Sequence, residues 1–101
     1  MIGKLDIPNI FIFEWDQGNL EHIKKHNVSY NECEDIFFNI PVYFRDEKHS
    51  GREERYLVYG ITNENRLLTA VFTIRKDKIR VISARDQHKK EKEIYKANNK
   101  F

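Results

Sequence analysis

The chain has 101 residues, one cysteine and a formal net charge of +2 at neutral pH. This length suits one domain with one modest core, and the single Cys33 excludes an intrachain disulfide and suits a reducing cytoplasm. Charged residues make up 34% of the chain and its mean hydropathy is −0.74, while its longest mostly apolar stretch, residues 67–74, is far too short to span a bilayer.

The N-terminal residues predict a leader followed by a strand. Residues 1–8 contain Gly3 and Pro8 and are expected to form a loose leader ahead of one domain over residues 9–101. Residues 10–15, IFIFEW, are β-branched and aromatic, which favours a strand.

Two helices are predicted to follow this strand. Asp16 can cap a helix over residues 17–26, and Asn27 can end it in the left-handed conformation. Ser29 and Glu32 form S-x-x-E, the capping box of a second helix. An inward-facing thiol on that helix is not expected to act as a nucleophile. The residues expected to face inward are Leu20 and Ile23 on the first helix and Tyr30, Cys33, Ile36 and Phe37 on the second.

The rest of the chain predicts a sheet and a closing helix. Residues 67–74, LLTAVFTI, are apolar on both faces, as in an interior strand, and residues 75–78 suit a hairpin turn. Asp86 is the expected N-cap of the closing helix. The other predicted strands cover residues 42–46, 55–60 and 79–85. The element order is then β-α-α-β-β-β-β-α, which predicts a single α+β domain with a mainly antiparallel sheet packed by helices.

Charge is distributed unevenly along the chain. Residues 1–40 hold three lysines against seven acidic residues, a net −4, whereas residues 41–101 hold 15 basic against nine acidic residues, a net +6. A basic C-terminal part suggests an anionic partner, although a solvated surface of mixed charge explains the same count. The four glycines are scattered, which excludes a glycine-rich phosphate loop.

Two histidines lie four residues apart on the first predicted helix, which is a spacing found in zinc sites. His22 is followed by Ile23, however, where the zincin motif needs glutamate, so two histidines on a helix surface are the better interpretation. Lys25 and His26 lie in the last turn, where positive charge complements the helix dipole. A histidine beside a lysine is also a workable general base or acid.

Arginines are the other candidates for chemistry. On the exposed face of an antiparallel sheet, a guanidinium is a permanently charged fork that suits phosphate. The alternative is ion pairing with neighbouring carboxylates such as Glu53, Glu54 and Asp86. The lysines that begin the closing helix also favour a phosphate, together with the amides of its first turn. The residues predicted to bind phosphate are Arg45, Arg52, Arg75, Arg80, Lys89 and Lys90.

Three segments together resemble the BrnT family, small ribonuclease toxins of bacterial type II toxin–antitoxin pairs. They are FEWDQGNLEHIKKHNVSYNE, ERYLVYG and ISARDQHKKEKEIY, and the resemblance covers about residues 11–96. Three positions depart from the family pattern. Asn27 stands where the family usually has glycine, Gln87 stands where a small residue is common, and His88 is not a recognised family position.

The resemblance implies a RelE-like fold and RNA cleavage without a metal or other cofactor. It also implies two partners, the RNA substrate and a cognate antitoxin whose DNA-binding part resembles a ribbon-helix-helix. No membrane partner is expected, and toxin and antitoxin are expected to form a hetero-oligomer.

The residues that fall on family motif positions are Lys25, His26, Glu54, Arg55 and Arg85. His26 or Glu54 is the candidate general base for the 2′-hydroxyl, Arg55 and Arg85 are the candidates for holding the phosphate charge, and Lys25 assists them. Two alternatives lie outside enzymology. One is a non-catalytic basic module that binds nucleic acid or protein, and the other is a structural partner whose charged surface only serves an antitoxin.

Overall fold

Three helices and five strands follow one another in a computed structural model that describes residues 4–5 and 12–99. The strands are β1 (Lys4–Leu5), β2 (Val42–Arg45), β3 (Tyr56–Ile61), β4 (Leu67–Arg75) and β5 (Lys78–Asp86). The helices are α1 (Gln17–Lys24), α2 (Tyr30–Phe38) and α3 (Lys89–Asn99). This order confirms the predicted α+β arrangement and is compatible with a RelE-like fold. None of the helices among these residues is long and apolar enough to cross a membrane.

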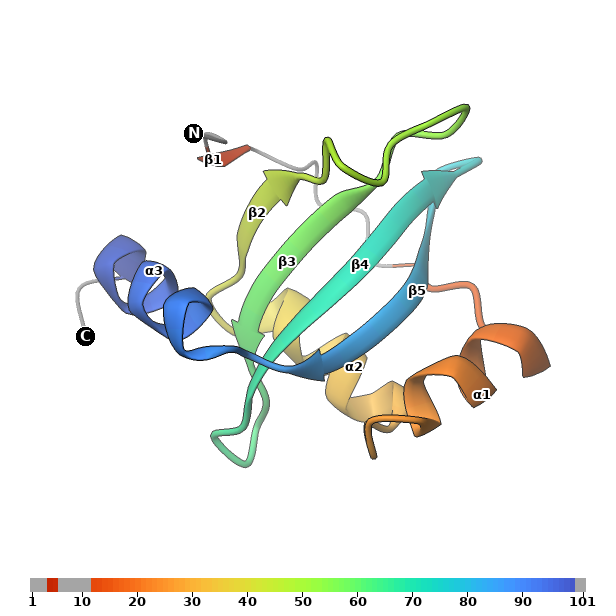
Figure 1. Cartoon of the computed structure of the whole chain (residues 1–101). Coiled ribbons are helices and arrows are strands. Elements are labelled where there is room, and N and C mark those ends of the chain that lie inside the picture. Colours follow the sequence, from red (N-terminus) through yellow and green to blue (C-terminus); the bar gives the residue numbers. More distant parts are fainter. Residues whose placement is uncertain (1–3, 6–11, 100–101) are drawn as a thin grey trace.

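The strands form one antiparallel sheet in the order β1-β2-β3-β4-β5. Strand β4 lies between β3 and β5, as its apolar sequence predicts. The β4–β5 hairpin turns at Lys76 and Asp77, whose φ angles of 49° and 64° suit the twist of a two-residue hairpin. In Figure 1, α2 lies behind the sheet, α1 lies near β5, and α3 extends from the end of β5 beside β2 and β3.

The sheet face toward α2 carries the main core. Val58, Ala70, Phe72 and Val81 are each 0% exposed on this face, and the ring of Phe72 packs edge-on against that of Phe37, with centroids 5.1 Å apart. The opposite face has a smaller cluster at one end, where α3 packs. Tyr95 lies there against Val42, Phe44 and Tyr59. The rest of this second face is not covered by a helix (Figure 1).

A close approach joins α2 to the sheet at Gly60. A Cβ at this position would lie 2.5 Å from the carbonyl oxygen of Ile36 and 2.6 Å from its Cβ. Real Cβ atoms do not approach neighbours so closely, so only glycine lets α2 lie at this depth on β3.

The first strand differs from the prediction. Among the described residues of the predicted strand 10–15, Phe13 forms only an isolated parallel bridge with Ile79, because the chain passes β5 at a single residue before turning into α1. Residues 10 and 11 lie outside the described part. The strand that opens the order is instead β1, which lies within the predicted leader of residues 1–8. The remainder of that leader lies outside the described residues.

Local capping signals are confirmed at both N-terminal helices. Asp16 accepts a hydrogen bond from the Asn19 amide at 3.1 Å, and Ser29 accepts one from the Glu32 amide at 3.2 Å. Asn27 has the predicted left-handed backbone, with φ 56°. The predicted inner face of α2 is correct for its three other members but wrong for Tyr30, which is 46% exposed and packs against the edge of Trp15.

The predicted N-cap of the closing helix is wrong. Asp86 still belongs to β5, where it pairs with Leu68, and its carboxylate accepts hydrogen bonds from Arg66. Helix α3 begins three residues later, and Glu91 reaches back to accept a hydrogen bond from the His88 amide at 2.8 Å. Strand pairing therefore competes successfully with the local capping preference of aspartate.

Candidate active site

A depression of about 220 Å³ lies on the sheet face that α2 does not cover. Three of its lining residues carry charge or titrate, one from a helix and two from a single loop. Its lining residues are His22, His49, Arg55, Val71, Ile82 and Ser83. His22 comes from α1, His49 and Arg55 come from the β2–β3 connection, and the other three come from β4 and β5.

A β-bulge shapes the floor of this depression. Val71 pairs with Ser83 but the next residue, Phe72, pairs with Val81, so Ile82 is an extra residue on β5. An inserted residue bends its strand and re-aims neighbouring side chains, and such bulges are common beside active sites. The bulge places both Ile82 and Ser83 at the wall of the depression.

The β2–β3 loop is fixed by hydrogen bonds at its base. The Asp46 amide donates to the Arg55 carbonyl at 2.8 Å, so the strands keep pairing one step beyond β2. The Ser50 hydroxyl donates to the Asp46 carbonyl at 2.8 Å and accepts from the Arg55 amide at 3.0 Å. These bonds use only the backbone of Arg55, which leaves its guanidinium to line the depression.

Asp46 and His49 form a pair within this loop. The Asp46 side chain is buried, with 8% of its surface exposed, and its Oδ2 lies 2.9 Å from His49 Nδ1. A carboxylate can only accept, so Nδ1 carries the hydrogen and the Nε2 of a neutral imidazole keeps its lone pair. This is the arrangement by which a carboxylate orients a histidine for proton transfer.

The five residues implied by the resemblance lie in four places. Arg55 lines the depression. Helix α1 ends at Lys24, two residues before the predicted end, so Lys25 is its C-cap and His26 lies in the turn that follows, both with exposed side chains. Glu54 accepts two hydrogen bonds from Arg45, each 3.0 Å long, which lower the pKa of Glu54 below its ordinary value.

Arg85 is held by Glu91. Two hydrogen bonds of 2.7 and 2.9 Å join its guanidinium to the Glu91 carboxylate, which also accepts from Thr69 at 3.1 Å and from the His88 amide. Burial favours the neutral form of Glu91, but these bonds outweigh it and hold the pKa of Glu91 below its ordinary value. Arg85 and Glu91 thus fasten the start of α3 to the end of β5, and Tyr95 fastens its middle by donating to the Ile40 carbonyl at 2.8 Å.

The other predicted phosphate ligands divide into paired and exposed groups. Arg75 binds Glu53 at 2.6 Å, Arg80 binds Asp16 at 2.8 Å, and Arg45 binds both Glu54 and Glu47. Of these six predicted ligands, Arg52, Lys89 and Lys90 have exposed side chains with no hydrogen-bond or ion-pair partner among residues 12–99.

Arg66 is the most extensively bonded arginine. It donates to the carboxylates of Asp86 and Glu32 and to the carbonyls of His26 and Asn27. Its bonds to Asp86 raise the pKa of Arg66 above its ordinary value. Arg66 therefore joins the end of α1 to the start of α2 and to β5, which fixes the helix that carries His22.

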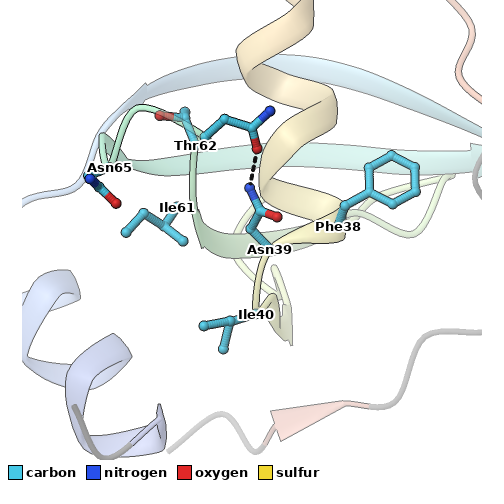
Figure 2. Close-up of a pocket in the computed structure, with 7 residues that line it drawn as sticks. Phe38, Asn39, Ile40, Ile61, Thr62 and Asn65 are labelled. Carbon is cyan, nitrogen blue, oxygen red and sulfur yellow. Dashed lines mark hydrogen bonds between the residues drawn. The ribbon is translucent and has the colours of Figure 1, made fainter.

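A larger hollow of about 550 Å³ lies where α2 ends and β3 turns into β4 (Figure 2). The Asn39 amide donates to the Asn63 side chain at 2.7 Å across it. Its lining residues are Phe38, Asn39, Ile40, Ile61, Thr62, Asn63 and Asn65. None of these seven side chains titrates near neutral pH, so this hollow offers no group for acid–base chemistry.

The single cysteine lies in the core. Cys33 is 0% exposed on α2, and burial raises the pKa of its thiol to about 12. A protonated, inaccessible thiol is a poor nucleophile, which agrees with its predicted structural role.

The resemblance identified Arg55, but it did not identify the histidines of the depression. Asp46 and His49 are three residues apart in a loop that the sequence analysis treated only as polar. An aspartate and a histidine at that spacing are a weak signal, because only the loop conformation brings their side chains together. His22 had been interpreted as surface, since nothing in the sequence places α1 beside the depression.

Comparisons with known proteins bear on this site. A family model described as the ribonuclease toxin BrnT of type II toxin–antitoxin systems matches residues 15–91, about three quarters of the chain. A search of curated proteins finds no match. The matched segment includes every residue that lines the depression.

Proposed function

Because the chain belongs to the BrnT family of ribonuclease toxins of type II toxin–antitoxin systems, we propose that it is an endoribonuclease that needs no metal ion. The observation that supports cleavage is the depression itself, where two imidazoles and a guanidinium line one surface. Imidazoles transfer protons near neutral pH, and a guanidinium stabilises a charged phosphate. None of its six lining residues has a carboxylate, the group that usually anchors Mg²⁺.

The resemblance and the geometry together suggest how this function is divided. Arg55 holds the phosphate at the depression, and Lys25 and His26 bind RNA at the adjoining end of α1. Glu54 and Arg85, which the resemblance also places in the site, act through the ion pairs that keep β2, β3 and α3 in place. The exposed Arg52, Lys89 and Lys90 are free to contact further phosphates of the substrate.

Cleavage is tested directly with the purified chain and a labelled single-stranded RNA of mixed sequence. Cleavage should persist in EDTA and should yield 2′,3′-cyclic phosphate ends. Binding without cleavage would favour the alternative of a non-catalytic nucleic-acid-binding module. Cleavage that EDTA abolishes and Mg²⁺ restores would contradict the metal-independent mechanism.

Neutralisation by a cognate antitoxin is the second part of the proposal. Membership of a toxin–antitoxin family supports such a partner, and an antitoxin with a DNA-binding part and an acidic segment would suit the basic C-terminal part of this chain. Co-expression of the adjacent gene should restore growth and give a co-purifying complex. Growth arrest that persists in its presence would contradict this pairing.

We place the activity in the cytoplasm. The single, reduced Cys33 and an RNA substrate support that location. Fractionation of cells that express the tagged chain with its antitoxin should recover both proteins with the cytoplasmic fraction.

A further inference from the structure

We propose that His49 and His22 are the two proton carriers of this ribonuclease, that Asp46 positions His49, and that Arg55 holds the reacting phosphate between them. This inference rests on the proposed ribonuclease function and assigns the chemistry of the depression. It replaces His26 and Glu54, the general bases that the family resemblance suggested, with residues that line one surface.

The geometry of His49 suits a general base. Its Nδ1 is 2.9 Å from the carboxylate of Asp46, which is held in place because the Asp46 amide and carbonyl are both bonded within the loop. The lone pair on Nε2 is left for a substrate proton, and the carboxylate stabilises the imidazolium that forms. More than half of the His49 side chain is exposed, so a substrate can reach it.

His22 reaches the same depression from a different element. It lies on α1, and the bonds from Arg66 to the carbonyls of His26 and Asn27 fix the end of that helix. The groups around the two imidazoles are Asp46 and Arg55 from the loop, and Val71, Ile82 and Ser83, which are uncharged, from the sheet. Lys25 and His26 are the titratable neighbours one turn along α1.

The reaction balances with these groups alone. His49 Nε2 takes the proton of the 2′-hydroxyl as the 2′-oxygen attacks the adjacent phosphorus. A bond forms between the 2′-oxygen and phosphorus, and the bond from phosphorus to the 5′-oxygen breaks. The protonated His22 gives its proton to that departing 5′-oxygen. The products are a 2′,3′-cyclic phosphate and a 5′-hydroxyl, and Arg55 offsets the negative charge that builds on the phosphate.

The obvious competitors are less well placed. Glu54 is engaged by both nitrogens of the Arg45 fork, so accepting a substrate proton would require breaking a two-bond ion pair. His26 is exposed beyond the last turn of α1 and does not line the depression. Arg85 is likewise engaged by Glu91.

The first test compares single-turnover cleavage of the labelled mixed-sequence RNA by matched histidine variants. His49→Ala and His22→Ala should each lower the rate by about a hundredfold or more, the usual contribution of a general acid or base. His88→Ala, a histidine exposed at the start of α3, should change the rate by less than about twofold. Thermal melting should be unchanged in His22→Ala and His88→Ala. His49→Ala removes the partner of the buried Asp46 carboxylate, so its rate is measured below its melting transition, and His49→Gln serves if His49→Ala fails to fold.

The second test separates the two roles. In a substrate with sulfur in place of the bridging 5′-oxygen, the leaving thiolate departs without a proton because thiols are far more acidic than alcohols. His22→Ala should then regain most of its lost rate, whereas His49→Ala should stay slow. Asp46→Asn should lower kcat about tenfold with little change in KM, because Asp46 orients the base and does not bind the substrate.

The outcomes distinguish this inference from the function on which it rests. A wild-type chain that cleaves no RNA overturns the ribonuclease function, and this inference with it. A wild-type chain that cleaves, with His49→Ala and His22→Ala both fully active, overturns the histidine pair alone. If His26→Ala or Glu54→Gln is inactive while both histidine variants of the depression retain activity, the proton carriers are those of the family resemblance.

Discussion

The two faces of the sheet differ in what their side chains are free to do. Toward α2, Phe72 and its neighbours are fully buried, and Gly60 is fixed by the closeness of Ile36. On the opposite face, α3 covers one end and leaves the depression with His49 and Arg55 open to solvent. The main core therefore lies on one face and the candidate site on the other, so substitutions on the two faces should affect different measurements.

The largest effect is expected from Phe72→Ala on the covered face. Phe72 is 0% exposed and packs against three other aromatic rings, so its loss leaves a cavity and lowers the free energy of unfolding by about 4 kcal/mol. Urea denaturation followed by circular dichroism measures this change. Ile94→Ala, at an exposed position on α3, is the control and should cost less than about 1 kcal/mol. Equal losses from the two variants would show that the core is not concentrated as described.

The next effect concerns activity on the open face. Arg55→Ala should slow RNA cleavage by about a hundredfold, equivalent to about 2.7 kcal/mol of transition-state stabilisation. Its melting temperature should barely change, because the bonds of Arg55 to Ser50 and Asp46 use its backbone. Lys48→Ala, exposed in the same loop, should cleave at the wild-type rate. An active Arg55→Ala variant would remove this arginine from the site.

The substitution Arg85→Ala sharpens the comparison. Arg85 lies on the open face, but its guanidinium is held by the partly buried Glu91 carboxylate. Removing Arg85 leaves the Glu91 carboxylate, whose side chain is 16% exposed, without its charged partner, which should cost about 2 kcal/mol of stability. The more exposed pair of Arg75 with Glu53 should cost about 1 kcal/mol or less when Arg75 is replaced by alanine. Below the melting transition, Arg85→Ala should lose less activity than Arg55→Ala.

The smallest effect is a pH dependence at Glu91. The bonds that Glu91 accepts lower its pKa in the folded chain, so its contribution to stability is present above its ordinary pKa of 4.5 and is lost as pH falls through the lower folded value. Glu91→Gln cannot titrate, so its melting temperature should fall less between pH 6 and pH 3 than that of the wild type. Parallel falls in the two proteins would assign the acid sensitivity to the other paired carboxylates.

Local signals predicted the local structure well. Ser29 and Glu32 form the expected capping box because both partners lie within one turn of helix. Asp86 illustrates the limit of such signals. An aspartate before a helical sequence is a good N-cap. In the structure, however, the backbone of Asp86 pairs with Leu68 in the sheet and its carboxylate binds the guanidinium of Arg66. Both partners are distant in sequence, so the residues next to Asp86 do not predict them.

The candidate site was only partly predictable for the same reason. The resemblance pointed to Arg55, and the structure places this residue in the depression. His22 and His49 lie 27 positions apart, and the packing of α1 beside β5 together with the β2–β3 loop brings them to one surface. The predicted arginine set stays a prediction, and the sequence could not show which of its guanidinium groups have carboxylate partners in the fold.

Those carboxylate partners set how RNA binding should respond to ionic strength. The pairs are Arg45–Glu54, Arg75–Glu53, Arg80–Asp16 and Arg85–Glu91. A cation that binds single-stranded RNA normally displaces mobile counterions from the phosphates, which makes log K fall with log salt by about 0.7 for each phosphate neutralised. An arginine that already has a carboxylate beside it adds little net charge to this exchange. The measured salt slope should therefore count Arg55 and the exposed cations rather than the 18 basic residues of the chain.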